Sequence, residues 1–384
     1  MTQELPMIYL DHAATTPLDP EVAAAMQPYL TGSRFGNASS IHRYGREART
    51  AVDEARDAVA ALIRADYSEL YFTGGGTESD NLALIGGMLA APTDRNHLVT
   101  SAIEHHAVLH SAHFLRTLGY EVTTVPVDAD GLVSPDAVAA AMTERTALVS
   151  IMHANNEIGV VQPIKEIAGI AHAGGAKFHT DAVQTVGMLP VNVGELDCDL
   201  LTLCAHKIYG PKGIGALYIR QGTKVSPILH GGSQEREKRA GTENVGAIVG
   251  FGKAAEIAAD RRDADASHLI SLRERFLSGL RDAVPGLHLN GHAVKRLPNN
   301  VNISVEGLEG TTLLMNLDRL GVAASSGSAC SSGSIEPSHV LAAIGLSPTL
   351  ASSGIRFTPG RGTTEAEIES ATEIFARIVC KLRR

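Results

Sequence analysis

Short β-rich runs alternate with helix-length segments along the first two-thirds of the chain. Between residues 69 and 220 the runs read ELYF, HLVTS, YEVTTV, ALVSIMH, KFHTD, LLTLCA and GALYIR. Residues 46–63 carry apolar side chains three or four positions apart, which is typical of an amphipathic helix. Strands that alternate with helices in this way predict a mainly parallel sheet with helices on both faces.

The last third of the chain begins a second strand and helix pattern. A long helical stretch covers about residues 246–285, and the run NNVNISVEG follows at residue 299. A chain of 384 residues is long enough for a large and a smaller domain. We predict an α/β fold with a large domain over residues 13–260 and a smaller C-terminal α/β domain over residues 261–384. We expect residues 1–12 to join the smaller domain.

The composition argues against several classes of protein. The formal net charge is −9 and the pI is about 6.0, so no basic surface for nucleic acid or lipid is expected. No apolar run approaches the roughly 20 residues of a membrane span, and the first residues do not follow the signal-peptide pattern. The four cysteines form no CxxC pair, so neither a disulfide framework nor a zinc site is favoured. We expect a cytoplasmic protein with free thiols and no metal.

Three of the predicted strand ends carry residues that bind ligands or react. After LYF, the segment TGGGTESDN is a glycine turn that enters a helix, and its backbone N–H groups and the Thr77 hydroxyl suit a phosphate. Asp181 and Gln184 follow KFH, while His206 and Lys207 follow LLTL. Each motif alone also has a plain structural explanation, either as a helix cap or as a solvated side chain.

Together these strand ends offer an anion site, a carboxylate and an amine. Open α/β sheets bind ligands beyond the carboxyl ends of their strands. Pyridoxal phosphate needs this set of groups: a cradle for the phosphate, a partner for the ring nitrogen and a lysine that bonds the cofactor. We therefore predict a pyridoxal 5'-phosphate site at this edge of the sheet.

Four histidines gather in SAIEHHAVLHSAH, at positions 105, 106, 110 and 113. Histidines at helical spacing are also a metal-site pattern, so a metallohydrolase is an alternative. However, HExxH is absent and no carboxylate lies at a useful offset. One of these histidines, stacked on a flat cofactor ring, fits the pyridoxal interpretation better.

A single cysteine lies in SSGSACSSGS, residues 325–334, where every residue except Cys330 is Ser, Gly or Ala. Small polar residues carry little apolar surface, so we expect a mobile surface loop. A thiol on such a tether can reach a buried substrate and then a partner outside. The alternative is a linker cysteine without a role. Cys198 and Cys380 lack any such context, and we expect them to be packing residues.

The motifs together resemble the cysteine desulfurases of the NifS/IscS type. In order along essentially the whole chain they read YLDHAATTP, FGNASSIHRYGREAR, FTGGGTESDNLA, EHHAVL, MHANNEIGVVQPI, HTDAVQTVG, HKIYGPKGIGALY, RAGTENV, SSGSACSSGS and SSGIRFTPGR. The resemblance implies a fold-type I, aminotransferase-like homodimer with pyridoxal phosphate. It also implies that L-cysteine becomes L-alanine, leaving a persulfide on the enzyme whose sulfur passes to an acceptor protein.

The resemblance also implies roles for individual residues. Lys207 resembles the lysine that carries the cofactor, Cys330 the nucleophile that accepts sulfur, and His105 the histidine that stacks on the ring. We take His105 also as the candidate proton acceptor for the thiol. The positions that resemble cofactor-binding ones are Gly76, Thr77, His105, Asp181, Gln184, Cys204, His206, Lys207 and Thr242, the last supplied by the neighbouring subunit. Those that resemble substrate-binding ones are Asn156 and Arg356.

One position departs from the family and several functions stay open. Cys204 stands where the family commonly has a serine, and a thiol is a weaker hydrogen-bond donor than a hydroxyl. A selenocysteine lyase, a kynureninase-like hydrolase, a small aminotransferase and a non-catalytic sulfur-carrier scaffold are alternatives. The acceptor could serve iron–sulfur assembly, tRNA thiolation, thio-cofactor synthesis or DNA phosphorothioation.

Overall fold

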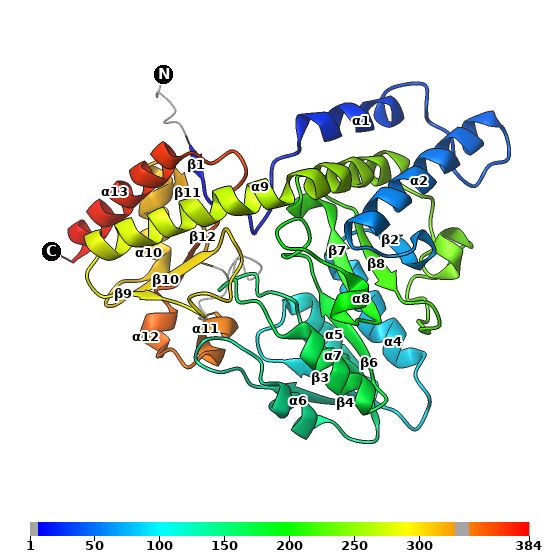
Figure 1. Cartoon of the computed structure of the whole chain (residues 1–384), viewed down its shortest axis with the longest axis horizontal. Coiled ribbons are helices and arrows are strands. Elements are labelled where there is room, and N and C mark those ends of the chain that lie inside the picture. Colours follow the sequence, from blue (N-terminus) through cyan, green and yellow to red (C-terminus); the bar gives the residue numbers. More distant parts are fainter. Residues whose placement is uncertain (1–6, 327–337, 384) are drawn as a thin grey trace.

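A seven-stranded sheet forms the larger part of the computed structural model, which describes residues 7–326 and 338–383 (Figure 1). Its strands lie in the order β2-β8-β7-β6-β5-β3-β4. Their bounds are β2 Leu70–Thr73, β3 His97–Ser101, β4 Glu121–Val125, β5 Thr146–Ser150, β6 Lys177–Asp181, β7 Leu200–Cys204 and β8 Gly215–Ile219. All seven β-rich runs of the sequence form strands, although the run at 147–153 leaves the sheet after residue 150.

The strand directions bring three strand ends to one edge of the sheet. β4, β3, β5, β6 and β7 are parallel, β8 is antiparallel to β7, and β2 is antiparallel to β8. β2 therefore points the same way as β6 and β7, and the carboxyl ends of these strands share an edge. The predicted α/β fold with a mainly parallel sheet is confirmed.

Neighbouring residues along the strands pack into hydrophobic clusters on opposite faces of the sheet, because side chains alternate along a strand. Val99 and Val149 belong to the cluster with α2 (Arg43–Leu62), α7 (Ile164–Ala173) and the start of α9. Leu98 and Leu148 belong to the cluster with α5 (His106–Thr117). Both faces are apolar, as a buried parallel sheet requires.

The remaining helices connect the strands or cover their edges. α2 contains nearly all of the predicted 46–63 helix but begins at Arg43, because the His42 side chain accepts the Gly45 N–H and caps it. The other bounds in this part are α1 Pro20–Leu30, η1 Tyr67–Glu69, α3 Gly76–Asn81, η2 Leu82–Gly86, α4 Gly87–Leu89, α6 Pro135–Ala141, α8 Val193–Leu196, η3 Ala205–Lys207 and η4 Gln234–Glu237.

Helix α9, Val245–Ala283, runs from the large sheet to a second core (Figure 1). There β12-β10-β9 form an antiparallel sheet, and β1 pairs in parallel with β11. The elements are β1 Ile8–Tyr9, β9 Leu287–Leu289, β10 Val301–Val305, α10 Gly310–Arg319, β11 Val322–Ala323, α11 His339–Ala343, α12 Pro348–Ala351, β12 Ile355–Phe357 and α13 Glu365–Leu382.

The second core is centred on three phenylalanines. The ring of Phe357 meets those of Phe276 and Phe375 edge to face, with centroids 5.1 and 5.6 Å away. Leu10 is buried in this cluster, whereas Ala258 belongs to the cluster of the large sheet. These memberships support the domain division near residue 260, which stays a prediction. No helix in the described ranges is long and apolar enough to cross a membrane.

Candidate active site

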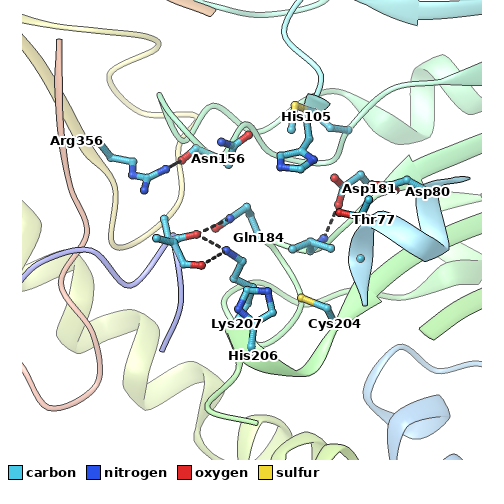
Figure 2. A pocket seen from close by; sticks show the side chains of 15 residues that line it. Thr77, Asp80, His105, Asn156, Asp181, Gln184, Cys204, His206, Lys207 and Arg356 are labelled. Atoms are coloured by element: carbon cyan, nitrogen blue, oxygen red, sulfur yellow. Dashed lines mark hydrogen bonds between the residues drawn. The ribbon is translucent and has the colours of Figure 1, made fainter. Parts of the chain in front are cut away.

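A cavity of about 390 Å³ opens at the shared carboxyl edge of the strands (Figure 2). Such a volume suits a small-molecule ligand. The residues that line it are Ala13, Ala14, Gly76, Thr77, Asp80, His105, Met152, Asn156, Asp181, Val183, Gln184, Cys204, His206, Lys207 and Arg356.

Ten of the twelve residues singled out from the sequence line this one cavity. Thr242 does not, and its side chain is exposed. Cys330 lies outside the described residues. The cavity thus brings together residues from the strand ends, the segment before α5, and β12.

The glycine turn after β2 forms one side of the cavity. Gly75 has φ of +151°, a conformation that other residues rarely adopt, and it makes no side-chain cap of α3. A Cβ at Gly76 would lie 3.0 Å from the Val183 side chain, so a larger residue would intrude here. Glu78 accepts the Gly74 N–H and is ion-paired to Arg239, which fixes the turn. The start of α3 therefore offers backbone donors to an anion.

Asp181 ends β6 with its carboxyl group in the cavity. One oxygen accepts the Val183 N–H at 2.9 Å, drawn as a dashed line in Figure 2. Burial raises the pKa of Asp181 to about 6, against a lowering by the Val183 N–H and the Lys207 charge. A cation placed against this carboxylate, such as a protonated ring nitrogen, would relieve the cost of its burial.

Lys207 lies in the short helix η3 directly after β7, and its ammonium group points into the cavity. Nζ donates to the carbonyl oxygens of Ala13 and Ala14 at 2.5 and 2.6 Å. Gln184 Nε2 donates to the same Ala13 oxygen at 3.0 Å. The segment after β1 therefore orients the amine through its backbone.

His105 caps the start of α5 and forms another wall of the cavity. Its Nδ1 accepts the Ala107 N–H at 3.1 Å, which fixes the ring. Burial, the Lys207 charge and the neighbouring histidines lower the pKa of His105 to about 4. The ring is therefore neutral at pH 7.

Arg356 on β12 closes the side of the cavity that faces the second core (Figure 2). Its guanidinium donates to Asp11 Oδ1 at 2.7 Å and to the Asn156 carbonyl at 2.8 Å. Arg356 Nε has no hydrogen-bond partner within the described ranges. A buried guanidinium with donors to spare suits a carboxylate.

Cys204 and His206 flank the lysine. Burial raises the pKa of the Cys204 thiol to about 12, so the group stays protonated and neutral. His206 Nδ1 lies 3.2 Å from the Thr15 hydroxyl, and burial lowers the pKa of His206 to about 4.

Sequence reasoning missed five of the lining residues. Asp80 lies inside the quoted TGGGTESDN motif, but the sequence alone does not distinguish it from a solvent-exposed helical aspartate. Met152 and Val183 are apolar and carry no chemical signal. Ala13 and Ala14 contribute their backbone carbonyls, and the residue type gives no sign of such a role.

The histidine cluster is real but does not form a metal site. The rings of His106 and His339 lie 4.8 Å apart, and those of His106 and His110 lie 5.2 Å apart. Among the described residues, no group of three or more His, Cys, Asp or Glu side chains could hold a metal ion. Of the two cysteines expected to pack, Cys198 is buried, but Cys380 is exposed near the end of α13 and that expectation was wrong.

The residues present fit pyridoxal phosphate. The cavity offers uncapped backbone donors at Gly76, a carboxylate at Asp181 whose burial calls for a cation, and an amine at Lys207. His105 supplies a neutral ring, and Gln184 an amide. The group would thus lie with its phosphate at the start of α3 and its ring nitrogen against Asp181.

Comparisons with known proteins agree with this geometry. The family model of class-V aminotransferases matches residues 8–370. A protein named cysteine desulfurase IscS from Dictyoglomus turgidum is 53% identical over 376 residues, 98% of this chain and 95% of that protein. One of the same name from Methanosarcina thermophila is 49% identical over 98% of this chain and 93% of its own length. The solved structure of a NifS-like protein superposes with a TM-score of 0.92 at 34% identity, covering 98% of this chain and 100% of that one.

Proposed function

Because the chain belongs to the class-V aminotransferases and, within them, to the pyridoxal-phosphate-dependent cysteine desulfurases, we propose that its cavity binds L-cysteine and that Cys330 takes up the sulfur. The enzyme converts L-cysteine to L-alanine. The Cys330 thiol and L-cysteine give L-alanine and a persulfide on Cys330, so that one sulfur atom moves and every other atom is retained.

The observation that carries the proposal is the meeting of Lys207, Asp181 and Arg356 in one cavity. The three come from η3, β6 and β12, and no local structure requires them to meet. A non-catalytic scaffold would have no use for a half-buried amine, a buried carboxylate and a buried guanidinium that line one cavity.

Each side chain has a task that follows from its surroundings. Arg356 grips the substrate carboxylate beside Asn156, which fixes the orientation of the substrate. Asp181 holds a proton on the ring nitrogen of the cofactor, and pyridoxal phosphate supplies an acceptor for the electron pair of the substrate. Lys207 Nζ takes the proton from the α-carbon. We keep His105 as the proposed proton acceptor for the Cys330 thiol, of which only a few per cent is ionised at pH 7 when its pKa is ordinary. This role requires the pKa of His105 to rise, during the reaction, well above the value of about 4 that burial and the neighbouring charges give it.

We also propose a homodimer, in which Thr242 serves the neighbouring cofactor site. Thr242 is exposed, and Arg49 ties its neighbour Glu243 and the Ala38 carbonyl together. The loop between α1 and α2, which contains Ala38, also presents Phe35 and Ile41, which are 72% and 91% exposed. Two exposed apolar side chains on a loop beside an exposed polar residue fit an interface between copies. Light scattering of wild type and of Ile41→Asp tests this, with a smaller mass expected for the variant.

The sulfur acceptor and the compartment belong to the proposal as well. We propose a cytoplasmic enzyme that hands its persulfide sulfur to an acceptor protein for iron–sulfur clusters or another thio-product. The proposal rests on the free thiols of the chain and on the names of its relatives.

The first experiment incubates the purified protein, loaded with pyridoxal phosphate, with L-cysteine and a thiol reductant. We expect equimolar alanine and sulfide from the wild type and neither from Cys330→Ala. Cys198→Ala is the matched control, because Cys198 is buried away from the cavity, and we expect it to retain activity. If the loaded wild type forms no alanine, L-cysteine is not the substrate. If Cys330→Ala forms sulfide at the wild-type rate, the proposed role of Cys330 is wrong.

A further inference from the structure

Asp80 is a buried carboxyl group that none of the roles above uses. It lies on α3, faces the cavity and is only 1% exposed. Within the described part of the chain, Asp80 Oδ1 has no hydrogen-bond partner. Among the described residues, the basic side-chain atom nearest to Asp80 Oδ1 is His179 Nε2, 3.7 Å away. A buried ionised carboxylate with one oxygen left unbonded is costly, so the neutral form of Asp80 is favoured.

The surroundings of Asp80 strengthen this preference. Asp80 and Asp181 both line the cavity, and Figure 2 labels the two at the end of it near Thr77. Burial raises the pKa of Asp80 well above its ordinary value, and the charges of Asp181 and Glu104 raise it further, while the Thr202 hydroxyl lowers it. His179 supplies no positive charge, because burial lowers its pKa to about 3.

The two carboxyl groups of this pair differ in their partners. Asp181 accepts the Val183 N–H and feels the positive charge of Lys207, both of which favour its ionised form. Asp80 Oδ1 lacks such a donor. Two like charges in one buried site do not both persist, so a single proton settles on one of the two groups. The groups that act on Asp80 are Asp181 and His179 from β6, Thr202 and Cys204 from β7, and Glu104 from the segment before α5, while Lys207 from η3 lines the same cavity.

We propose that Asp80 is a positioning residue that takes up the proton shared by the Asp80–Asp181 pair, and so leaves Asp181 ionised to face the ring nitrogen of the cofactor. The inference rests on the cofactor site of the proposed function. Asp80 bonds neither the cofactor nor the substrate and acts only through the charge of Asp181. It leaves Asp181, next to the ring, as the only ionised member of the Asp80–Asp181 pair.

The test measures protonation directly and does not depend on desulfurase activity. Infrared difference spectra of the full-length protein at pH 7, wild type minus Asp80→Asn, are recorded with pyridoxal phosphate bound and again after its removal. The asparagine side chain matches a neutral carboxylic acid in size. We expect the C=O stretching band of a protonated carboxylic acid in the wild type, which disappears in the variant. A carboxylate band in its place would overturn the proposal.

Two further variants make the result specific. Asp199→Asn is the matched control, because Asp199 is equally buried but is paired with Lys177 and has a lowered pKa; its difference spectrum should show only carboxylate bands. In cofactor-free Asp181→Asn, the pH midpoint of the Asp80 band should fall by about one unit or more, because the neighbouring charge is gone. A midpoint within about 0.3 units of the wild type would refute the shared proton. If the loaded wild type shows the Asp80 band but forms no alanine from L-cysteine, the proposed function is wrong and the shared proton is not.

Discussion

Replacing Arg356 with lysine should weaken the grip on the substrate without disturbing the fold. A guanidinium has five N–H donors, and in Arg356 two of them serve Asp11 and the Asn156 carbonyl. Within the described ranges, one N–H on each of Nη1 and Nη2 is left without an acceptor, so a substrate carboxylate can be held at two points. A lysine has three donors, and once it serves the same two oxygens it keeps one. Arg356→Lys therefore loses one charge-assisted hydrogen bond to the substrate.

The magnitude follows from the free energy of that bond. A hydrogen bond to a charged group contributes about 1.5–3 kcal/mol, which corresponds to a roughly 10- to 150-fold fall in kcat/KM. Steady-state alanine formation over a range of L-cysteine concentrations measures this. Arg361→Lys is the matched control, because the Arg361 guanidinium also donates to two acceptors, the carboxylates of Asp265 and Asp19, but does not line the cavity. A fall of less than about threefold in Arg356→Lys would refute the assigned contact.

Three further substitutions probe the cofactor site and the fold. Cys204→Ser should lower the Kd for pyridoxal phosphate about fivefold, because a hydroxyl gains about 1 kcal/mol over the thiol as a donor; an absorbance titration that gives an unchanged Kd would remove Cys204 from the phosphate site. Arg56→Met should cost about 3–5 kcal/mol in urea unfolding, because it leaves the buried Glu235 carboxylate without its paired guanidinium; Arg56→Met combined with Glu235→Gln should recover part of the loss, and no recovery would contradict the pairing. Burial lowers the pKa of His153 to about 4, so protonation of the unfolded chain below about pH 6.5 costs the folded state stability as the pH falls. His153→Gln should therefore lose about 2 kcal/mol less than wild type between pH 7 and 5 in urea unfolding, and parallel losses would show that His153 does not contribute.

Much of the fold could be predicted from the sequence, because the strands of a parallel sheet buried on both faces are continuous apolar runs. Phe178 and Leu201 are fully buried in such runs, and a run of this kind has few other structures open to it. The helix at residues 46–63 followed from its apolar spacing, whereas its start at Arg43 depended on a histidine cap that propensity does not single out. The run at 147–153 ended early because Met152 N–H bonds the Glu104 carboxylate rather than a neighbouring strand.

Site residues could be predicted from the sequence where a reactive or ligand-binding side chain stands at the end of a predicted strand. Lys207 and Asp181 stand at strand ends, where an amine and a carboxylate together indicate a cofactor site. Asp80 stands inside a helix, and only its burial beside Asp181 distinguishes it from a solvated aspartate. The carbonyls of Ala13 and Ala14 were beyond sequence reasoning, because every residue carries such a group and tertiary contacts alone select these two.

The pairing of residues near 11 with residues near 356 affects how this enzyme is made in the cell. A ribosome releases the Asp11 segment first, yet its partner Arg356 is made 345 residues later. At about 5–20 residues per second, the early segment waits roughly 20–70 s before it can dock. The side of the cavity that Arg356 closes is therefore completed last, and we expect the cofactor to be retained only after synthesis. A nascent chain stalled before residue 356 should hold a folded large sheet that cannot retain pyridoxal phosphate.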